Sequence, residues 1–335
     1  MGGVRSAEGV GEGMGDAVEE SEGEFVNARG VRLATRQVVP AADGGAPVCA
    51  VYVFLHGLGD WSGRYVHVLR ALAARGVACH AVDHEGHGKS EGVRAYVGKW
   101  EGLVDDCEAF AASVVGQYRG EGDGGAAPPC YVHGQSMGGL AALYVAARDP
   151  DRWSGVVLTS PALGVEMNCI LRVQSLFSPC LSACFPQARI VDAVRPQDMC
   201  RDEAGWKAYR DDPLNTCGPT CVRTAVEIKR AFDGLWDPEG VCGRFSLPLL
   251  ILHGTVDKCT LLSMSERFVD ECATPPDAKR LVRLTHLYHT LFHEPEKDAV
   301  IRTLVAWVCD GGAASLGIHT VHDLDLTAVP AETPP

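Results

Sequence analysis

The stretch that decides the fold spans residues 131–147 and reads YVHGQSMGGLAALYVAA. It opens with a short apolar strand, Tyr131–Val132, and continues after the serine as an apolar helical pattern. Between them, residues 134–138 match G-x-S-x-G, in which a serine occupies a sharp strand-to-helix turn. Glycines flank the serine because such a turn has no room for side chains, and its strain exposes the hydroxyl. The pentapeptide could arise by chance in a chain with 38 glycines, but its context favours Ser136 as a nucleophile.

Strands and helices alternate on both sides of this stretch. We expect buried strands at Cys49–Phe54, Val77–Val82, Gly155–Ser160, Leu247–Leu252 and Arg280–Leu284, and helices at Tyr65–Arg75, Lys99–Arg119, Met137–Arg148 and Glu296–Val308. An opening hairpin is expected over residues 25–39. This alternation predicts an α/β fold in which helices cover both faces of a mostly parallel sheet. The alternation lapses over residues 163–245, which predicts an inserted subdomain.

A nucleophilic serine needs a base to take its proton and an acid to hold that base. In folds with this turn, the acid and then the histidine follow the serine, each after a later strand. Asp257 ends the loop HGTVD that follows an apolar strand. His286, His289 and His293 all follow the next predicted strand. We favour His289 as the base because it lies on the loop just before the last predicted helix.

Negative charge that develops on a substrate oxygen requires hydrogen-bond donors. The backbone N–H of Met137, directly after the serine, is one candidate, aided by the N-terminus of the following helix. The second candidate is the N–H of Leu58, in the loop HGLGD that follows an earlier apolar strand. Both donors are therefore expected on the same edge of the sheet as the serine.

The segment DHEGHGKS at residues 83–90 contains Gly-Lys-Ser, which also ends phosphate-binding loops. Such a loop requires glycine five positions before Gly88, and Asp83 stands there instead. We therefore predict a turn that packs beneath the site loops, with structural rather than catalytic histidines.

The net charge of −13 is concentrated at the two ends of the chain. Residues 1–24 contain seven acidic side chains and one arginine, and residues 310–335 contain four acidic side chains and no basic one. Both segments are predicted to be disordered tails. The acidity argues against nucleic acid as a partner, whereas the nearly neutral middle of the chain leaves lipid contact open. We expect neither a secretory signal nor a membrane-spanning helix.

Fourteen cysteines without a predicted signal indicate a reducing compartment, so we expect free thiols and a cytoplasmic location. Cys180 and Cys184, like Cys217 and Cys221, have a spacing that zinc could use, but it also places both members on one helix face. We expect small buried residues here and no metal. The opening MGGVRS fits myristoylation at Gly2, which would attach the chain only weakly and reversibly.

Several separated motifs carry a family resemblance. They are HGLGDWSGRY (residues 56–65), GHGKS (86–90), GQSMGG (134–139), the aspartate loop and YHTL (288–291). Together they resemble the monoacylglycerol lipase and lysophospholipase branch of the α/β-hydrolases, the serine aminopeptidase S33 or hydrolase-4 grouping. The resemblance implies an α/β-hydrolase core over residues 25–162 and 246–309, and a helical cap or lid over residues 163–245.

The resemblance also implies site residues. It assigns Ser136, Asp257 and His289 to the catalytic triad, and Leu58 and Met137 to the oxyanion donors. It places contacts to a glycerol head group on Asp60, Arg64 and Tyr209, the last of which belongs to the cap segment AYRDDPL. No cofactor is implied.

Two positions depart from the family pattern at the polar end of its pocket. Gln135 stands where monoacylglycerol lipases often have histidine, and Phe292 stands where they have a second histidine after the catalytic one. These departures leave the ester chemistry intact but weaken the preference for glycerol over other alcohols.

The lid segment 169–185 has apolar residues at helical spacing and one charged residue. This pattern is typical of plain core, but on a cap it could also dock transiently on a membrane or lipid droplet and open an acyl tunnel. Leu176 and Phe177 are the residues on which this hypothesis depends.

The sequence as a whole predicts a serine esterase that cleaves a lipid ester through an acyl-enzyme, with monoacylglycerol as the favoured substrate. A lysophospholipase or a broad carboxylesterase is the alternative within the same chemistry. An acyltransferase and a non-catalytic receptor are the alternatives from other classes. An epoxide hydrolase or dehalogenase is disfavoured, because either would have aspartate at position 136.

Overall fold

A computed structural model of the chain describes residues 18–43, 45–119, 127–164, 180–316 and 320–326. Within these residues, nine strands form one sheet in the order β1-β2-β4-β3-β5-β6-β9-β10-β11. The strands are β1 Val18–Val26, β2 Arg32–Pro40, β3 Ala50–Leu55, β4 Val77–Val82, β5 Cys130–Gln135, β6 Gly155–Thr159, β9 Leu249–Gly254, β10 Lys279–Leu284 and β11 Val321–Leu324. β2 pairs antiparallel with β1 and β4, and all other neighbours are parallel. The predicted mostly parallel sheet is confirmed.

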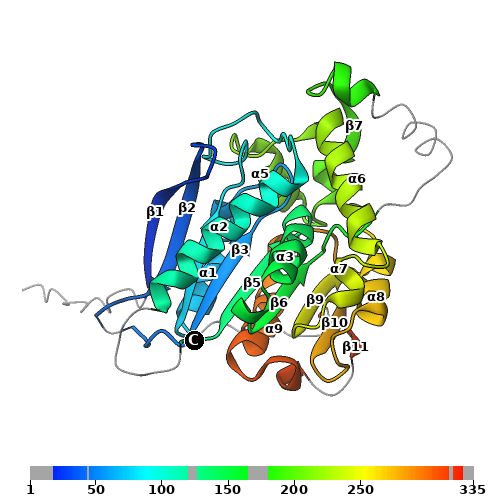
Figure 1. Cartoon of the computed structure of the whole chain (residues 1–335). Coiled ribbons are helices and arrows are strands. Elements are labelled where there is room, and N and C mark those ends of the chain that lie inside the picture. Colours follow the sequence, from blue (N-terminus) through cyan, green and yellow to red (C-terminus); the bar gives the residue numbers. More distant parts are fainter. Residues whose placement is uncertain (1–17, 44, 120–126, 165–179, 317–319, 327–335) are drawn as a thin grey trace, which may run out of the picture.

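Helices cover both faces of this sheet because its central strands are apolar on both sides. In β3, Val51 and Val53 face one core cluster, whereas Tyr52 and Phe54 face the other. The first cluster is closed by helices α2 (Trp100–Tyr118), α3 (Met137–Arg148) and α8 (Leu262–Glu271), and the second by α1 (Val66–Ala73) and α9 (Lys297–Cys309). Figure 1 shows α2 and α3 lying together across one face. The site described below lies where the parallel strands end.

The segment between β6 and β9 forms a separate group of elements at one end of the sheet (Figure 1). Its described part contains β7 (Arg189–Val194), a 3-10 turn at Pro196–Asp198, α5 (Glu203–Asp211), β8 (Gly218–Cys221), α6 (Val222–Trp236) and α7 (Val241–Arg244). β7 and β8 pair antiparallel as a small second sheet. The cap expected from the sequence is therefore mixed rather than purely helical, since Ile190, Val191 and the left-handed Gly218 favour a ribbon.

The predicted tails also differ from the structure. Residues 18–24 belong to β1, which pairs along its whole length with β2. Its acidic side chains find partners, because Glu20 and Glu22 both pair with Arg36. At the other end, β11 extends the sheet beside β10, where Asp323 pairs with Arg283. A run of acids reads as a solvated tail only when the arginines that neutralise it, distant in sequence, are ignored.

The described helices include none that is long and apolar enough to cross a membrane.

Candidate active site

The predicted turn at Ser136 is present, between the last residue of β5 and the first residue of α3. Ser136 has φ 54° and ψ −119°, a left-handed conformation that is strained for a residue with a side chain. A Cβ on Gly134 would lie 2.0 Å from the carbonyl oxygen of Gly138, and a Cβ on Gly138 would lie 2.1 Å from that of Leu55. The two glycines are therefore required by close backbone contacts, as the sequence predicts.

The loop after β3 passes directly beside this turn. A Cβ on Gly57 would lie 3.0 Å from the Cβ of Ser136, so only glycine allows the approach. The next residue, Leu58, is half-buried and packs against the first core cluster. Met137 begins α3, and the N–H groups of a first helical turn have no partner within the helix. The geometry thus brings both predicted donor loops to the serine.

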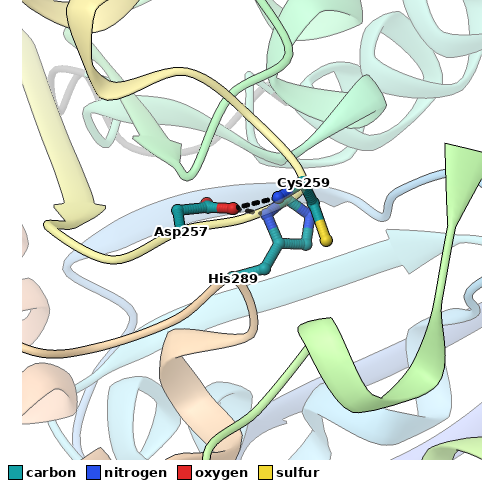
Figure 2. A group of neighbouring side chains, drawn as sticks. All are labelled: Asp257, Cys259 and His289. Carbon is teal, nitrogen blue, oxygen red and sulfur yellow. Dashed lines mark hydrogen bonds and ion pairs between the residues drawn. The ribbon is translucent and has the colours of Figure 1, made fainter.

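Asp257 and His289 meet across the ends of β9 and β10. The Nδ1–H of His289 donates to Oδ2 of Asp257 at 2.8 Å, and Figure 2 shows the carboxylate facing the imidazole ring. His289 is buried, with 2% of its surface exposed. Of the three candidate histidines only this one contacts Asp257, because His286 is exposed and Nε2 of His293 contacts the carbonyl oxygen of Arg64.

The carboxylate of Asp257 is held by its own loop. Its Oδ1 accepts hydrogen bonds from the backbone N–H groups of Cys259 and Thr260, and its Oδ2 accepts one from the Thr260 hydroxyl. Nε2 of His253 lies 3.4 Å from the same Oδ2. Burial alone would raise the pKa of Asp257, but His289 and His253 hold this pKa well below its usual range. The acid is therefore ionised and fixed in place.

The sequence analysis missed Thr260 and His253 as partners of the acid. Thr260 also contacts the carbonyl oxygen of Ser160 at 3.1 Å, which ties the acid loop to the end of β6. The available signal was a threonine three residues after an aspartate, a spacing at which side chains commonly bond to the local backbone.

Cys259 also lies beside this pair. One ligand atom each from Asp257, Cys259 and His289 lies within 4.8 Å of the others, so these residues include a donor set that metals accept (Figure 2). The carboxylate and Nδ1 are already bonded to each other, and burial raises the pKa of the Cys259 thiol. The arrangement therefore suits proton transfer between a serine and an oriented histidine better than a resident metal ion.

The three side chains expected to contact a head group instead contact one another. Nη1 of Arg64 lies 3.0 Å from both carboxylate oxygens of Asp60, and its guanidinium lies 4.6 Å above the ring of Tyr209. The Tyr209 hydroxyl donates to the carbonyl oxygen of Gly59 at 3.4 Å, and Asp60 and Tyr209 are fully buried. The structure thus differs from the expectation: these residues tie α5 of the cap to the loop after β3.

The expectation for Phe292 also differs from the structure. Phe292 is 1% exposed and packs against Tyr65 and His133 in the second core cluster, so it faces the interior rather than a polar pocket. Leu176 and Phe177, on which the lid hypothesis depends, lie outside the described residues, as does Gly2.

The segment 83–90 packs beneath the loop after β3, as predicted. The N–H of His84 donates to Nε2 of His56 at 3.0 Å, and Asp83 accepts hydrogen bonds from the N–H groups of Ser62 and Lys89. Burial lowers the pKa of His87 to about 3. These histidines are therefore neutral supports of the donor loop.

A cap segment grips the loop that carries His289. The N–H and the hydroxyl of Thr290 both donate to the carbonyl oxygen of Met199, each at 2.7 Å. Arg201 pairs with the buried Glu294, which in turn accepts a hydrogen bond from the N–H of Tyr288. Sequence reasoning gave no sign of this grip, because its two halves are about 90 residues apart.

The order of the parallel strands, with a left-handed serine after the fifth strand and an acid and a histidine after two later ones, is that of the α/β-hydrolases, and the chain is a member of this class. A family model described as "Serine aminopeptidase, S33" (Hydrolase_4) matches residues 46–296, about three quarters of the chain. The chain therefore belongs to the Hydrolase_4 family.

Named relatives have related activities. A monoacylglycerol lipase of Mycolicibacterium smegmatis is 27% identical over 296 residues, covering 86% of this chain and 96% of the relative. A human monoglyceride lipase is 29% identical over 287 residues, covering 85% and 89%. Among solved structures, a soluble variant of monoglyceride lipase from Saccharomyces cerevisiae with a substrate analog has TM-score 0.73 and 20% identity, covering 84% of this chain and 92% of that one. This last likeness shows the fold.

Proposed function

We propose that the chain is a serine hydrolase that cleaves carboxylic esters of lipids, with monoacylglycerol as the preferred substrate. The observation that carries this proposal is the buried 2.8 Å contact between His289 and Asp257, beside a serine in a strained, left-handed turn. Membership of the Hydrolase_4 family and the names of its relatives support the same chemistry.

The reaction follows from the roles of these residues. His289 Nε2 takes the proton of the Ser136 hydroxyl as its oxygen attacks the ester carbonyl carbon. The N–H groups of Met137 and Leu58 donate to the oxygen that becomes negative. The C–O bond to the alcohol then breaks, and His289 returns the proton to the leaving alcohol. Water attacks the acyl-enzyme in the same way and releases the fatty acid and the free serine.

A fluorophosphonate probe tests the catalytic assignment. Wild-type protein is expected to label once, at Ser136, and Ser136→Ala is expected to lose both labelling and ester hydrolysis. A matched control is Ser113→Ala, on α2 away from the site, which should label like the wild type. Labelling that persists in Ser136→Ala would contradict the proposal.

The choice of alcohol is tested with a substrate panel of monoacyl-, diacyl- and lysophospholipid esters of varied chain length. Monoacylglycerols are expected to give the highest kcat/KM. The buried state of Asp60, Arg64 and Tyr209 leaves recognition of the glycerol hydroxyls to other groups. A higher value for lysophospholipids would favour the alternative function, and acyl transfer to an added alcohol in place of hydrolysis would favour an acyltransferase.

We also propose that the cap contacts the lipid surface that supplies the substrate. Phe185 and Ile190, on the described part of the cap, each expose 62% of their surface, which is unusual for large apolar residues. The double variant Phe185→Asp/Ile190→Asp should weaken liposome binding and long-chain turnover while sparing a soluble short-chain ester. The matched control is Val26→Asp/Val48→Asp, two exposed apolar positions outside the cap. An equal fall in both activities would contradict lipid docking.

The thirteen described cysteines are all free, which supports a reducing, cytoplasmic location. The expected result is that a fluorescent fusion fills the cytoplasm, with a fraction on membranes that the Phe185 and Ile190 variants lose.

A further inference from the structure

The proton-accepting nitrogen of His289 has a partner other than the serine. Nε2 of His289 lies 3.2 Å from Nε2 of Gln135. Because Nδ1 faces the ionised carboxylate of Asp257, which can only accept, Nδ1 carries the ring proton and Nε2 has a lone pair. The group of Gln135 that faces Nε2 must therefore be the amide NH₂, which donates to it. Among the described hydrogen bonds, Nε2 of His289 has this one and none to Ser136.

Gln135 is fixed in this position. It is the last residue of β5, directly before the serine, and only 2% of its surface is exposed. Its Oε1 lies against the loop after β3, where a Cβ on Gly57 would approach it to 2.5 Å. The side chain thus fills the space between that loop and the imidazole ring, with little freedom to turn elsewhere.

We propose that Gln135 is a positioning residue that occupies the lone pair of His289 in the resting enzyme and competes for it with the Ser136 hydroxyl. The inference deepens the proposed function and rests on it. A neutral imidazole has one lone pair at Nε2, so it cannot accept from Gln135 and from Ser136 at full strength together. The serine becomes a good nucleophile only when this hydrogen bond is given up.

The proposal predicts opposite roles for an amide and for a carboxylate at position 135. The amide donates and so favours the neutral ring, which is the form that accepts a proton. A carboxylate accepts and so favours the protonated ring, which cannot act as base. The titratable groups that face the ring from the described elements are Asp257 and Cys259, with His253 beyond the carboxylate, and they are the same in every variant.

The test is the rate of fluorophosphonate labelling of Ser136 between pH 5 and 9. Gln135→Met keeps the side-chain length and removes the donor, so labelling at pH 8 should be about two- to tenfold faster than in the wild type, the weight of one neutral hydrogen bond. Gln135→Glu should move the acid limb of the profile upward by about 1 to 3 pH units. Gln37→Met and Gln37→Glu, on β2, are matched controls and should follow the wild type.

The outcomes separate this inference from the proposed function. If wild-type Ser136 does not label at all, the function itself is wrong. If it labels but Gln135→Met is no faster and Gln135→Glu keeps the wild-type acid limb, competition by Gln135 is wrong. Gln135→Asn, whose shorter amide does not reach the ring, replaces Gln135→Met if the latter melts early, and it should be faster for the same reason.

Discussion

The loops that hold the site and the cap that covers them are built in contrasting ways. The site loops end strands that are bonded on both sides, and the carboxylate of Asp257 alone accepts three hydrogen bonds from its own loop. The cap has a two-stranded ribbon and helices such as α6, whose outer face carries exposed ion pairs such as Lys229–Asp233. It reaches the core through single contacts, for example between Thr216 N–H and the carbonyl oxygen of Gly59.

This difference teaches where each part of the function resides. Groups that move protons must keep their distances to within a fraction of an ångström, and a sheet of parallel strands provides that constancy. A part that selects and admits the substrate can be held more lightly. Chemistry is therefore expected to fail abruptly when the core is altered and gradually when the cap is altered.

The largest effect is expected from the acid in the core. Asp257→Asn keeps the shape of the side chain but no longer fixes the histidine tautomer, so kcat should fall about 10⁴-fold. Steady-state hydrolysis of a short-chain ester measures this change. Asp270→Asn, a carboxylate near the end of α8, is the control and should retain full activity. A loss of less than tenfold in Asp257→Asn would remove the assigned role.

An intermediate effect is expected where the cap grips the core. Arg201→Met leaves the buried Glu294 without its cation and loosens the loop of His289, so kcat should fall about 10- to 100-fold with little change in KM. Lys229→Met breaks an exposed pair on the same cap and should change nothing measurable. Equal activities of the two variants would show that the cap does not hold the histidine in place.

The smallest effect concerns stability in the core. Burial lowers the pKa of His133 to about 3, whereas an unfolded histidine titrates near pH 6.5. Between these values the unfolded chain binds a proton that the folded chain does not, so the free energy of unfolding decreases as the pH falls through this window. His133→Gln should reduce the loss between pH 7 and pH 5 by about 2 kcal/mol, measured by urea unfolding.

The control for this prediction is Thr159→Val, which removes the hydroxyl that contacts Nε2 of His133 at 2.9 Å but keeps the histidine. It should lower stability by the same amount at both pH values. A pH dependence in His133→Gln that matches the wild type would mean that His133 is protonated in the folded chain.

Local patterns explain which parts were predictable from sequence. The apolar runs of β3, β4 and β9, and the glycines around Ser136, reflect constraints within a few residues, and they predict the sheet and the turn. The pairing of β1 with β2, the burial of Asp60 by Tyr209 and the contact of Gln135 with His289 depend on residues distant in the sequence. Their side chains are polar, and polarity alone does not say which partner neutralises it.

The acidic strand β1 has one more consequence. It lies at the outer edge of the nine-stranded sheet with nearly all its residues exposed, so one row of its backbone N–H and C=O groups has no neighbouring strand. Such an open edge invites a strand from a second copy and the growth of aggregates. Glu19, Glu20, Glu22 and Glu24 lie along it, and two such edges would repel each other. The acid-rich start of the chain thus protects the enzyme from sticking to itself.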